Sequence, residues 1–357
     1  MKKISLPFLS DTQRDLRDTI HDLLEQRHNG PAPDPAGRDA VGLWSALTDL
    51  GIGGVLVPEE LGGLGLGAVE YCLLGLELGW YAVSQPVLDH VATSGVVARH
   101  GCKALADAWL GDLLTGRAIC TLTSPRVPFA IDADSVDAIL CVSAGNAYLV
   151  AAENCKLVRL QSMDSNRRIF RVEHPRRAED LLSADPAAIA YIDDLTALGS
   201  ASFLTGLAAR MFFDARDYAA IRKQFGRPIG SFQAVAHKLA SCYVLVERAV
   251  VTTLRAAQEY DRRADDVAVS IARTIAGHTA QRLSLDVLQT FGGIGFTAEH
   301  HIGHWLKLGK AHEATGGSVR LHRDRISDAW FSNHRSIGRG PEVDHPSGSG
   351  LNSVLTA

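Results

Sequence analysis

Apolar positions change their spacing twice along the chain. From about residue 10 to residue 115 they recur with the period of a helix that buries one face, and they predict helices at residues 11–28, 43–50 and 68–80. From about residue 117 they gather in short β-branched runs between turn residues, which is typical of strands. The predicted strands are residues 118–123, 138–142, 147–151, 156–160, 169–172 and 187–192.

Helical spacing returns from residue 198 to about residue 330. The apolar side chains of the first segment fall on one helix face, namely Leu204, Leu207, Met211, Phe212, Ala215 and Tyr218. Three further helical segments are predicted at residues 233–262, 266–289 and 299–328.

This order of elements predicts an α+β fold that is mostly α. We expect an N-terminal helical domain (1–116), a reduced middle β-domain (117–196) and a C-terminal four-helix bundle (197–336). Residues 337–357 are rich in Gly, Pro and Ser, and this composition predicts a disordered tail.

Composition narrows the classes of function. The 357 residues suffice for two or three domains, and the net charge of −4 gives no reason to expect nucleic acid or an anionic membrane as partner. The six cysteines are scattered, without the spacing of a zinc site, which suits free thiols in a reducing cytoplasm. No apolar run of roughly twenty residues stands out, so we expect a soluble cytoplasmic protein.

A glycine-dense loop at residues 58–67 precedes the predicted helix at residues 68–80. Such a loop can cradle a phosphate at a helix N-terminus. It can equally be a tight connector whose glycines adopt positive φ angles, and the sequence favours this second interpretation.

Two strings in the C-terminal half carry the strongest signal. The first is Arg222-Lys-Gln-Phe-Gly-Arg-Pro-Ile-Gly-Ser-Phe-Gln233, and the second is Leu288-Gln-Thr-Phe-Gly-Gly-Ile-Gly-Phe-Thr-Ala-Glu-His300. Each string alone is explained by glycines that end a helix. As an ordered pair between long amphipathic helices, they resemble the C-terminal domain of the acyl-CoA dehydrogenase family, and the resemblance covers the chain to about residue 330.

The resemblance implies an FAD site shared between two protomers. In that family the two strings hold the adenosine diphosphate half of FAD from opposite subunits, so FAD binding and assembly depend on each other. The matching positions in this chain are Arg222, Gln224, Phe225, Gln233, Gln289, Gly292 and Gly293.

The base expected of the family is missing. Most members remove the α-proton of an acyl thioester with a glutamate, and Gly316 stands at that position here. A minority of members carry the base at a position that falls near Thr196 in this chain, where again no carboxylate is present. The nearest substitutes are Glu313 and the pair Asp193-Asp194, so the catalytic residue is unknown.

The middle domain also departs from the family pattern. Members cover the flavin ring with a Thr-Glu-Pro-x-Ala-Gly-Ser segment and a later tryptophan-containing strand. This chain has Leu122-Thr-Ser-Pro-Arg-Val-Pro128 and nothing similar to the second strand. The half of the site that would hold the flavin ring is therefore poorly matched.

The chain is most similar to the subunit that lacks the base in the heterotetrameric acyl-CoA dehydrogenases of actinobacterial steroid side-chain degradation. Gly292-Gly-Ile-Gly-Phe-Thr-x-Glu-His300 carries this finer resemblance. It implies an α,β-dehydrogenation of an acyl-CoA or acyl-carrier thioester, a second subunit of the same fold, and an electron-transfer flavoprotein or similar acceptor.

Two alternatives stay open. One is a homodimeric member repurposed in secondary metabolism, which acts on a carrier-protein or CoA thioester. The other is a non-catalytic subunit that serves assembly alone. Histidines gather at positions 300, 301, 304 and 312, but the zincin carboxylate motif is absent and we expect no metal site.

Overall fold

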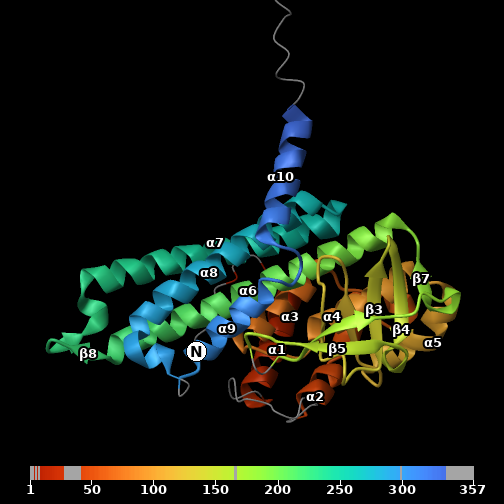
Figure 1. Cartoon of the computed structure of the whole chain (residues 1–357). Coiled ribbons are helices and arrows are strands. Elements are labelled where there is room, and N and C mark those ends of the chain that lie inside the picture. The colour runs from red at the N-terminus through yellow and green to blue at the C-terminus, as the bar shows by residue number, and fades with distance from the viewer. Residues whose placement is uncertain are drawn as a thin grey trace, which may run out of the picture.

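A 36-residue helix, α6 (Pro186–Ile221), runs through the middle of the molecule in the computed structural model, which describes residues 4, 6, 9–27, 42–164, 167–297 and 300–334 (Figure 1). The side chain of Asp185 accepts a hydrogen bond from the Ala187 amide at 2.9 Å, and Pro186 occupies the first turn. Both features favour a helix start. The predicted strand at residues 187–192 is therefore wrong, because these residues form the first turns of α6.

Helix α6 is long and apolar enough to cross a membrane by length and composition. An 18-residue window of it has a mean hydropathy of 1.2, but 94% of that window is buried inside the protein. Burial against neighbouring helices explains this composition, because a helix that is apolar on all sides fits the core of a large protein.

The bundle forms where the other C-terminal helices pack on α6. These helices are α7 (Gln233–Arg263), α8 (Asp266–Phe291), α9 (Ile302–His312) and α10 (Val319–His334). The single segment predicted at residues 299–328 is divided in two, because Gly316 and Gly317 adopt φ angles of 71° and 86° and end the helical path. Helix α10 packs on α8 and then projects from the body (Figure 1).

The N-terminal helices cover one side of the bundle. They are α1 (Asp11–Arg27), α2 (Leu43–Asp49), α3 (Ala68–Trp80), α4 (Val87–His100) and α5 (Lys103–Leu114). Helix α3 touches α6 almost backbone to backbone. A Cβ added at Gly79 would lie 2.0 Å from the carbonyl oxygen of Phe203, and one added at Gly206 would lie 1.9 Å from that of Leu76.

The middle of the chain folds into two small sheets beside the N-terminal helices. One sheet has the order β1-β3-β4-β7 and the other has the order β2-β6-β5. The strands are β1 (Cys120–Thr123), β2 (Ala130–Ile131), β3 (Ala138–Ser143), β4 (Asn146–Ala151), β5 (Lys156–Leu160), β6 (Ile169–Glu173) and β7 (Leu181–Ser183). The α+β, mostly α fold is confirmed. The domain boundaries stay predictions, and the tail at residues 337–357 lies outside the described residues.

The glycine-dense loop at residues 58–67 acts as a connector. Gly62 and Gly65 adopt φ angles of 84° and 60°. The amides of Ala68 and Val69 at the start of α3 donate to the carboxylate of Asp261 at 2.7 and 3.2 Å. A carboxylate from α7 thus occupies the place that a phosphate would take at this helix N-terminus.

The close contact of α3 with α6 makes a prediction for stability. Gly206→Ala should lower the free energy of unfolding by about 1–3 kcal/mol, because its methyl group overlaps the α3 backbone. Gly111→Ala on α5 is the matched control, since no atom lies within 4 Å of its Cβ position, and it should raise stability by up to about 1 kcal/mol. Chemical denaturation measures both. Equal effects of the two substitutions would contradict the packing described here.

Candidate functional site

The two family strings lie at one end of the bundle, where α6 and α8 finish. After α6 the chain forms a two-stranded hairpin, β8 (Lys223–Gln224) with β9 (Arg227–Pro228), and then enters α7 (Figure 1). After α8 it turns through the short 3-10 helix η6 (Gly292–Phe296). Both strings thus lie at the same end of this protomer, whereas the resemblance implies that they act on one FAD from opposite protomers.

The hairpin presents its side chains to solvent. Arg222, Gln224 and Gln233 are exposed, and Phe225 at the tip has 93% of its surface exposed with a φ of 51°. A positive φ is strained for a phenylalanine. Strained backbone of this kind is often found at functional sites. Among the described residues, only Phe232 has a ring contact with Phe225, edge-on with 6.2 Å between ring centroids.

The end of α8 offers open backbone beside a polar side chain. Gln289 is exposed and its Oε1 accepts a hydrogen bond from Lys238 Nζ on α7. A Cβ added at Gly292 or Gly293 would meet no atom within 4 Å. An extended anionic ligand could therefore approach the main chain here closely, with Arg222 and Lys238 as cations of the same bundle end.

At the expected base position, the loop of residues 313–318 is packed onto α6. Gly316 has a φ of 71°, and a Cβ there would lie 2.6 Å from the carbonyl oxygen of Thr196 and 2.9 Å from Cα of Ala197. Each contact is shorter than real Cβ contacts, and the backbone conformation itself disfavours a side chain. The two expected base positions, Gly316 and Thr196, therefore touch each other and leave no room for a carboxylate between them.

Two buried side chains lock this loop. Arg273 is 0% exposed and donates to the carbonyl oxygens of Glu313 at 2.8 Å and Thr315 at 3.1 Å. His322, also buried, donates from Nε2 to the Gly316 carbonyl oxygen at 2.7 Å. Burial lowers the pKa of His322 to about 4, so the ring is neutral at pH 7 and keeps one N–H for this bond.

The substitute carboxylates point elsewhere. Glu313 forms an ion pair with Lys310 Nζ at 3.0 Å on the partly exposed side of α9. Asp193 pairs with Arg126 at 2.9 Å, and Asp194 pairs with Arg325 at 3.2 Å. Burial raises the pKa of Asp194 to about 6, which would suit a base, but its side chain lines a separate cleft of about 470 Å³ beside Tyr191 and Tyr260.

The segment at residues 122–128, which stands where the family has its flavin-covering loop, is closed on itself. Thr123 Oγ1 donates to the Val127 carbonyl oxygen at 3.0 Å, and Ser124 Oγ accepts from the Arg126 and Val127 amides at 3.2 Å. Arg126 is held by Asp193 on α6. Both hydroxyls of the segment are thus engaged within its own turn.

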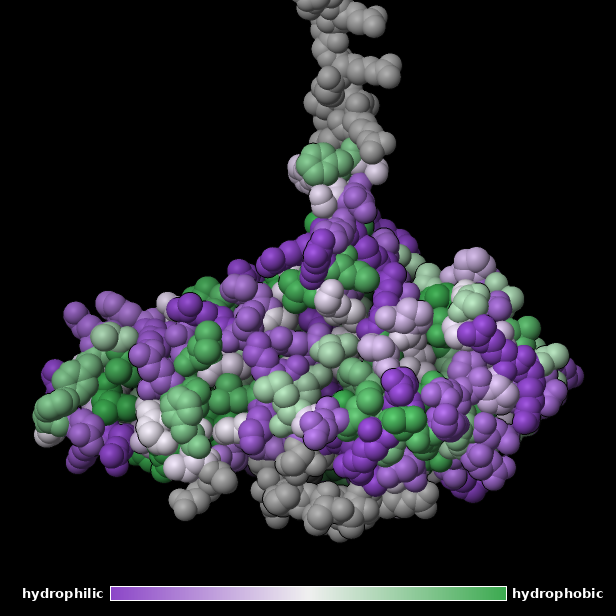
Figure 2. Space-filling model, viewed as in Figure 1, coloured by the Kyte–Doolittle hydropathy of each residue, from purple (hydrophilic) through white to green (hydrophobic). Residues whose placement is uncertain are grey.

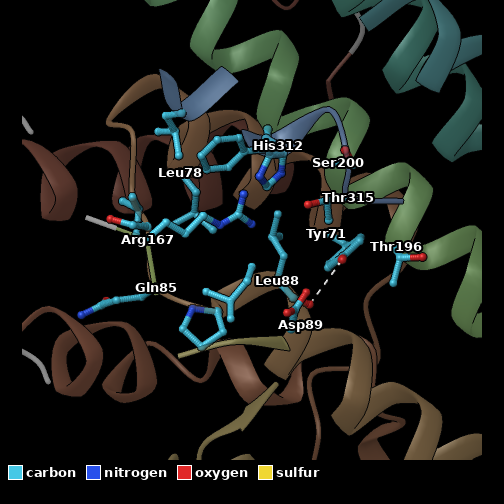
Figure 3. Close-up of a pocket in the computed structure, with 17 residues that line it drawn as sticks. Tyr71, Leu78, Gln85, Leu88, Asp89, Arg167, Thr196, Ser200, His312 and Thr315 are labelled. Atoms are coloured by element: carbon cyan, nitrogen blue, oxygen red, sulfur yellow. Dashed lines mark hydrogen bonds between the residues drawn. The ribbon is translucent and has the colours of Figure 1, made fainter. Parts of the chain in front are cut away.

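A small cavity lies next to the Gly316 loop, between α3, α4, α6 and α9 (Figure 3). Its volume is about 30 Å³, enough for only one or two water molecules. Arg167, Ser200, His312 and Thr315 line it together with Asp89. The sequence did not predict that these residues lie together. Only tertiary packing brings Arg167 of the β-domain next to helices that are distant from it in the sequence.

The histidines at positions 300, 301, 304 and 312 do not converge. His301 pairs with Asp214 at 3.3 Å, His304 pairs with Asp164 at 3.3 Å, and His312 stacks on Phe203 with 4.1 Å between ring centroids. Among the described residues, no group of three or more His, Cys, Asp or Glu side chains is placed to hold a metal ion.

The packing at Gly316 makes a testable prediction. Gly316→Ala should lower the free energy of unfolding by about 2–4 kcal/mol, because it adds steric overlap with α6 to backbone strain. Gly145→Ala is the matched control, since Gly145 has a φ of 78° but no atom within 4 Å of its Cβ position, and it should lose only about 1 kcal/mol. If urea unfolding gives the same loss for both variants, the loop does not touch α6 as described.

Comparisons with known proteins agree with this architecture. The acyl-CoA dehydrogenase N-terminal domain family matches residues 10–117, and the acyl-CoA dehydrogenase C-terminal domain family matches residues 194–331. The chain is 30% identical over 315 residues to the acyl-CoA dehydrogenase IpdE2 of Mycobacterium tuberculosis. The alignment covers 86% of this chain and 91% of that relative.

Two solved structures share the fold. The ChsE4–ChsE5 complex from Mycobacterium tuberculosis gives a TM-score of 0.79 at 23% identity and covers 93% of this chain and 99% of that chain. The FAD complex of PigA gives a TM-score of 0.77 at 19% identity and covers 92% of this chain and 100% of that chain. With both terminal domains matched and a relative at 30% identity, the chain belongs to the acyl-CoA dehydrogenase family.

Proposed function

We propose that this chain is the subunit without a catalytic base in a heteromeric, flavin-dependent acyl-CoA dehydrogenase of the steroid side-chain type. The observation that carries this proposal is the contact between Gly316 and α6. A Cβ at residue 316 would lie 2.6 Å from the Thr196 carbonyl oxygen, so the space for a base and a substrate α-carbon is filled by the chain's own backbone.

The cavity beside this contact supports the same conclusion. Its volume of about 30 Å³ is far below the roughly 300–1,000 Å³ of pockets that hold a small-molecule ligand. An acyl thioester therefore does not fit in the cavity beside Gly316, and we infer that the acyl group binds in the partner subunit, which also supplies the base.

The exposed bundle end supports a role in FAD binding. Arg222 supplies a guanidinium fork for a phosphate, Gln224 and Gln289 supply amide groups, and the open backbone at Gly292 and Gly293 allows close approach of the adenosine diphosphate half. FAD, when bound, supplies a hydride acceptor. In this proposal the residues of this chain bind and orient the cofactor, and they move no proton.

The same end of the molecule has the character of an interface. Figure 2 shows apolar residues at its left end, where the hairpin lies in Figure 1. Large apolar side chains exposed there or along α7 and α8 include Ile221, Phe225, Val244, Leu285 and Phe296. Large apolar side chains gathered on an exposed surface are typical of a binding site for another protein. We infer a partner bundle of the same fold, with an electron-transfer flavoprotein or similar acceptor outside the assembly.

The flavin assignment predicts the effect of two substitutions. Arg222→Ala and Gln289→Ala should each reduce the flavin retained by the purified complex, and loss of the Arg222 contact should weaken FAD binding by about 1.5–3 kcal/mol. Arg117→Ala is the matched control, because Arg117 is an exposed arginine three residues beyond the end of α5, and α5 lies at the opposite end of the molecule from β8 (Figure 1). The ratio of flavin absorbance to protein measures retention. Unchanged flavin in both variants would remove these residues from the site.

The proposal also predicts how activity depends on assembly. The isolated chain should turn over acyl-CoA at least about 10²–10⁴-fold more slowly than a complex with a family member that bears a base, since general-base catalysis supplies roughly this factor. Glu313→Gln in the complex should leave the rate unchanged, because Glu313 is paired with Lys310 away from the cavity.

Two measurements test the assembly and the activity. They are light scattering and a flavin-coupled dehydrogenase assay, each made on the chain alone and on the co-expressed pair. An isolated chain that is yellow and active, and is inactivated by Glu313→Gln, would instead support a homomeric enzyme with Glu313 as base. A pair that assembles without any flavin or activity would leave this chain as an assembly subunit only.

A further inference from the structure

Two of the free cysteines lie side by side in the β-domain. Cys141 is the fourth residue of β3, and Cys155 lies between the 3-10 helix η3 (Ala152–Asn154) and β5. Strands β3 and β5 belong to different sheets, so Cys155 stands where the chain passes from one sheet to the other (Figure 1). We call these two residues the Cys141–Cys155 pair.

The strand pattern explains why the two side chains meet. Side chains alternate along β3, and those of Ile139 and Cys141 enter an apolar core that both sheets share. Cys155 packs against the same core, and its Sγ lies 3.8 Å from the Ala151 carbonyl oxygen. A side-chain hydrogen bond joins the two thiols. Sulfur atoms in such contact need little movement to form a covalent bond.

The two thiols differ in burial, and this gives them different roles. Cys141 is 1% exposed, whereas Cys155 is only partly buried. The S–H of Cys141 donates to Cys155 and holds the pKa of the Cys155 thiol below its ordinary value. The same hydrogen bond, together with burial, holds the pKa of Cys141 far above its ordinary value. Because the thiolate is the reactive form, Cys155 is the sulfur that reacts first.

A carboxylate beside the pair opposes a second thiolate. Asp180 ends the 3-10 helix η4 (Ala178–Asp180), and its charge acts against ionisation of both thiols. Cys141 therefore keeps its proton while Cys155 is a thiolate. A disulfide carries no charge, so it is compatible with a place that is partly buried and acidic.

Metal binding does not explain the pair. Thiolates that hold zinc in proteins are completed by further Cys, His or acidic ligands to a set of three or four. In the part of the chain that the structure describes, no group of three or more such side chains is placed to hold a metal ion. Two thiols in contact, one of them reachable from solvent, instead fit the pattern of a redox-active pair.

We propose that Cys141 and Cys155 form a reversible disulfide, made by reaction with a peroxide, that joins the two sheets of the β-domain. The Cys155 thiolate attacks one oxygen of hydrogen peroxide, which breaks the O–O bond, leaves a sulfenic acid on Cys155 and releases hydroxide, and solvent protonates the hydroxide. The Cys141 sulfur then attacks the Cys155 sulfur, and the sulfenic hydroxyl leaves with the Cys141 proton as water. Two thiols are oxidised, one peroxide is reduced to two waters, and a small dithiol reverses the reaction.

Peptide mapping of the full chain after treatment with hydrogen peroxide tests the proposal directly. Free thiols are blocked with N-ethylmaleimide in guanidinium chloride before digestion, so only thiols that were already oxidised escape the label. We expect a disulfide between the peptides that hold Cys141 and Cys155, a loss of two of the six thiols, and recovery of both with dithiothreitol.

Cys102→Ser is the matched control, because it removes an exposed cysteine and should leave this disulfide unchanged. If the bond does not form in the folded native chain, or forms only after the chain is unfolded, the proposal is wrong.

Two substitutions at Cys141 test the order of the steps. Serine keeps a donor for Cys155, and alanine removes it. At pH 7, iodoacetamide should alkylate Cys155 about threefold or more slowly in Cys141→Ala than in Cys141→Ser, because the thiolate fraction falls and higher nucleophilicity offsets only about half of that loss on a logarithmic scale.

After peroxide, both variants should hold Cys155 as a sulfenic acid that dimedone traps, since the sulfur that would displace it is missing. Equal alkylation rates in the two variants, or no sulfenic acid in either, would contradict the proposed reaction.

The bridge should also stabilise the chain. It closes the loop from residue 141 to residue 155 and so restricts the unfolded state, and the oxidised protein should melt about 3–5 °C above the reduced one. Cys155→Ser cannot form the bond, so its samples treated with peroxide and with dithiothreitol should melt together. A rise of the same size in Cys155→Ser, or no rise in the native chain, would contradict a bridge between the sheets.

Discussion

Helix α6 is the surface on which the other parts of the molecule meet, and its neighbours approach it at backbone distance. Gly79 and Gly206 let α3 lie against it, with 2.0 and 1.9 Å between their missing Cβ atoms and main-chain oxygens. Gly316 does the same for the loop after α9. Dense packing of this kind leaves no freedom to shift one element without shifting its neighbours. The shape of the site follows from this constraint more than from any one polar residue.

Close packing also determines where charge can reside. Arg273 and His322 donate hydrogen bonds to carbonyl oxygens of the Gly316 loop. Asp261 accepts hydrogen bonds from the amides at the start of α3. Asp193 and Asp194 each have a guanidinium partner. Asp193 and Asp194 are thus committed to ion pairs, which explains chemically why neither of them stands free beside the position of a reacting α-carbon.

Much of the fold could be predicted from local sequence. The helix at residues 68–80 has the bounds expected of it, because its apolar period and the preceding glycines are both strong signals. The strand predicted at residues 187–192 was wrong, because a short apolar run of this kind fits a strand as well as a helix. Only the cap at Asp185 decides between the two. The motif position of Gly316 was readable from sequence. Its contact with Thr196 was not, because residues 120 positions apart meet only through tertiary packing. The small cavity next to the Gly316 loop could not be predicted from the sequence for the same reason.

The positive φ of Gly316 has a consequence for how such a chain can change over generations. A codon change from glycine to glutamate would place the family's usual side chain at residue 316, yet its first carbon would overlap α6. The substitution becomes tolerable only after α6 and the loop have moved apart, and that movement alone would expose apolar core for no gain. Each step is disfavoured until the other has occurred. A glutamate at residue 316 is therefore out of reach of single substitutions, and under the proposed function a dependence on a partner, once acquired, is retained.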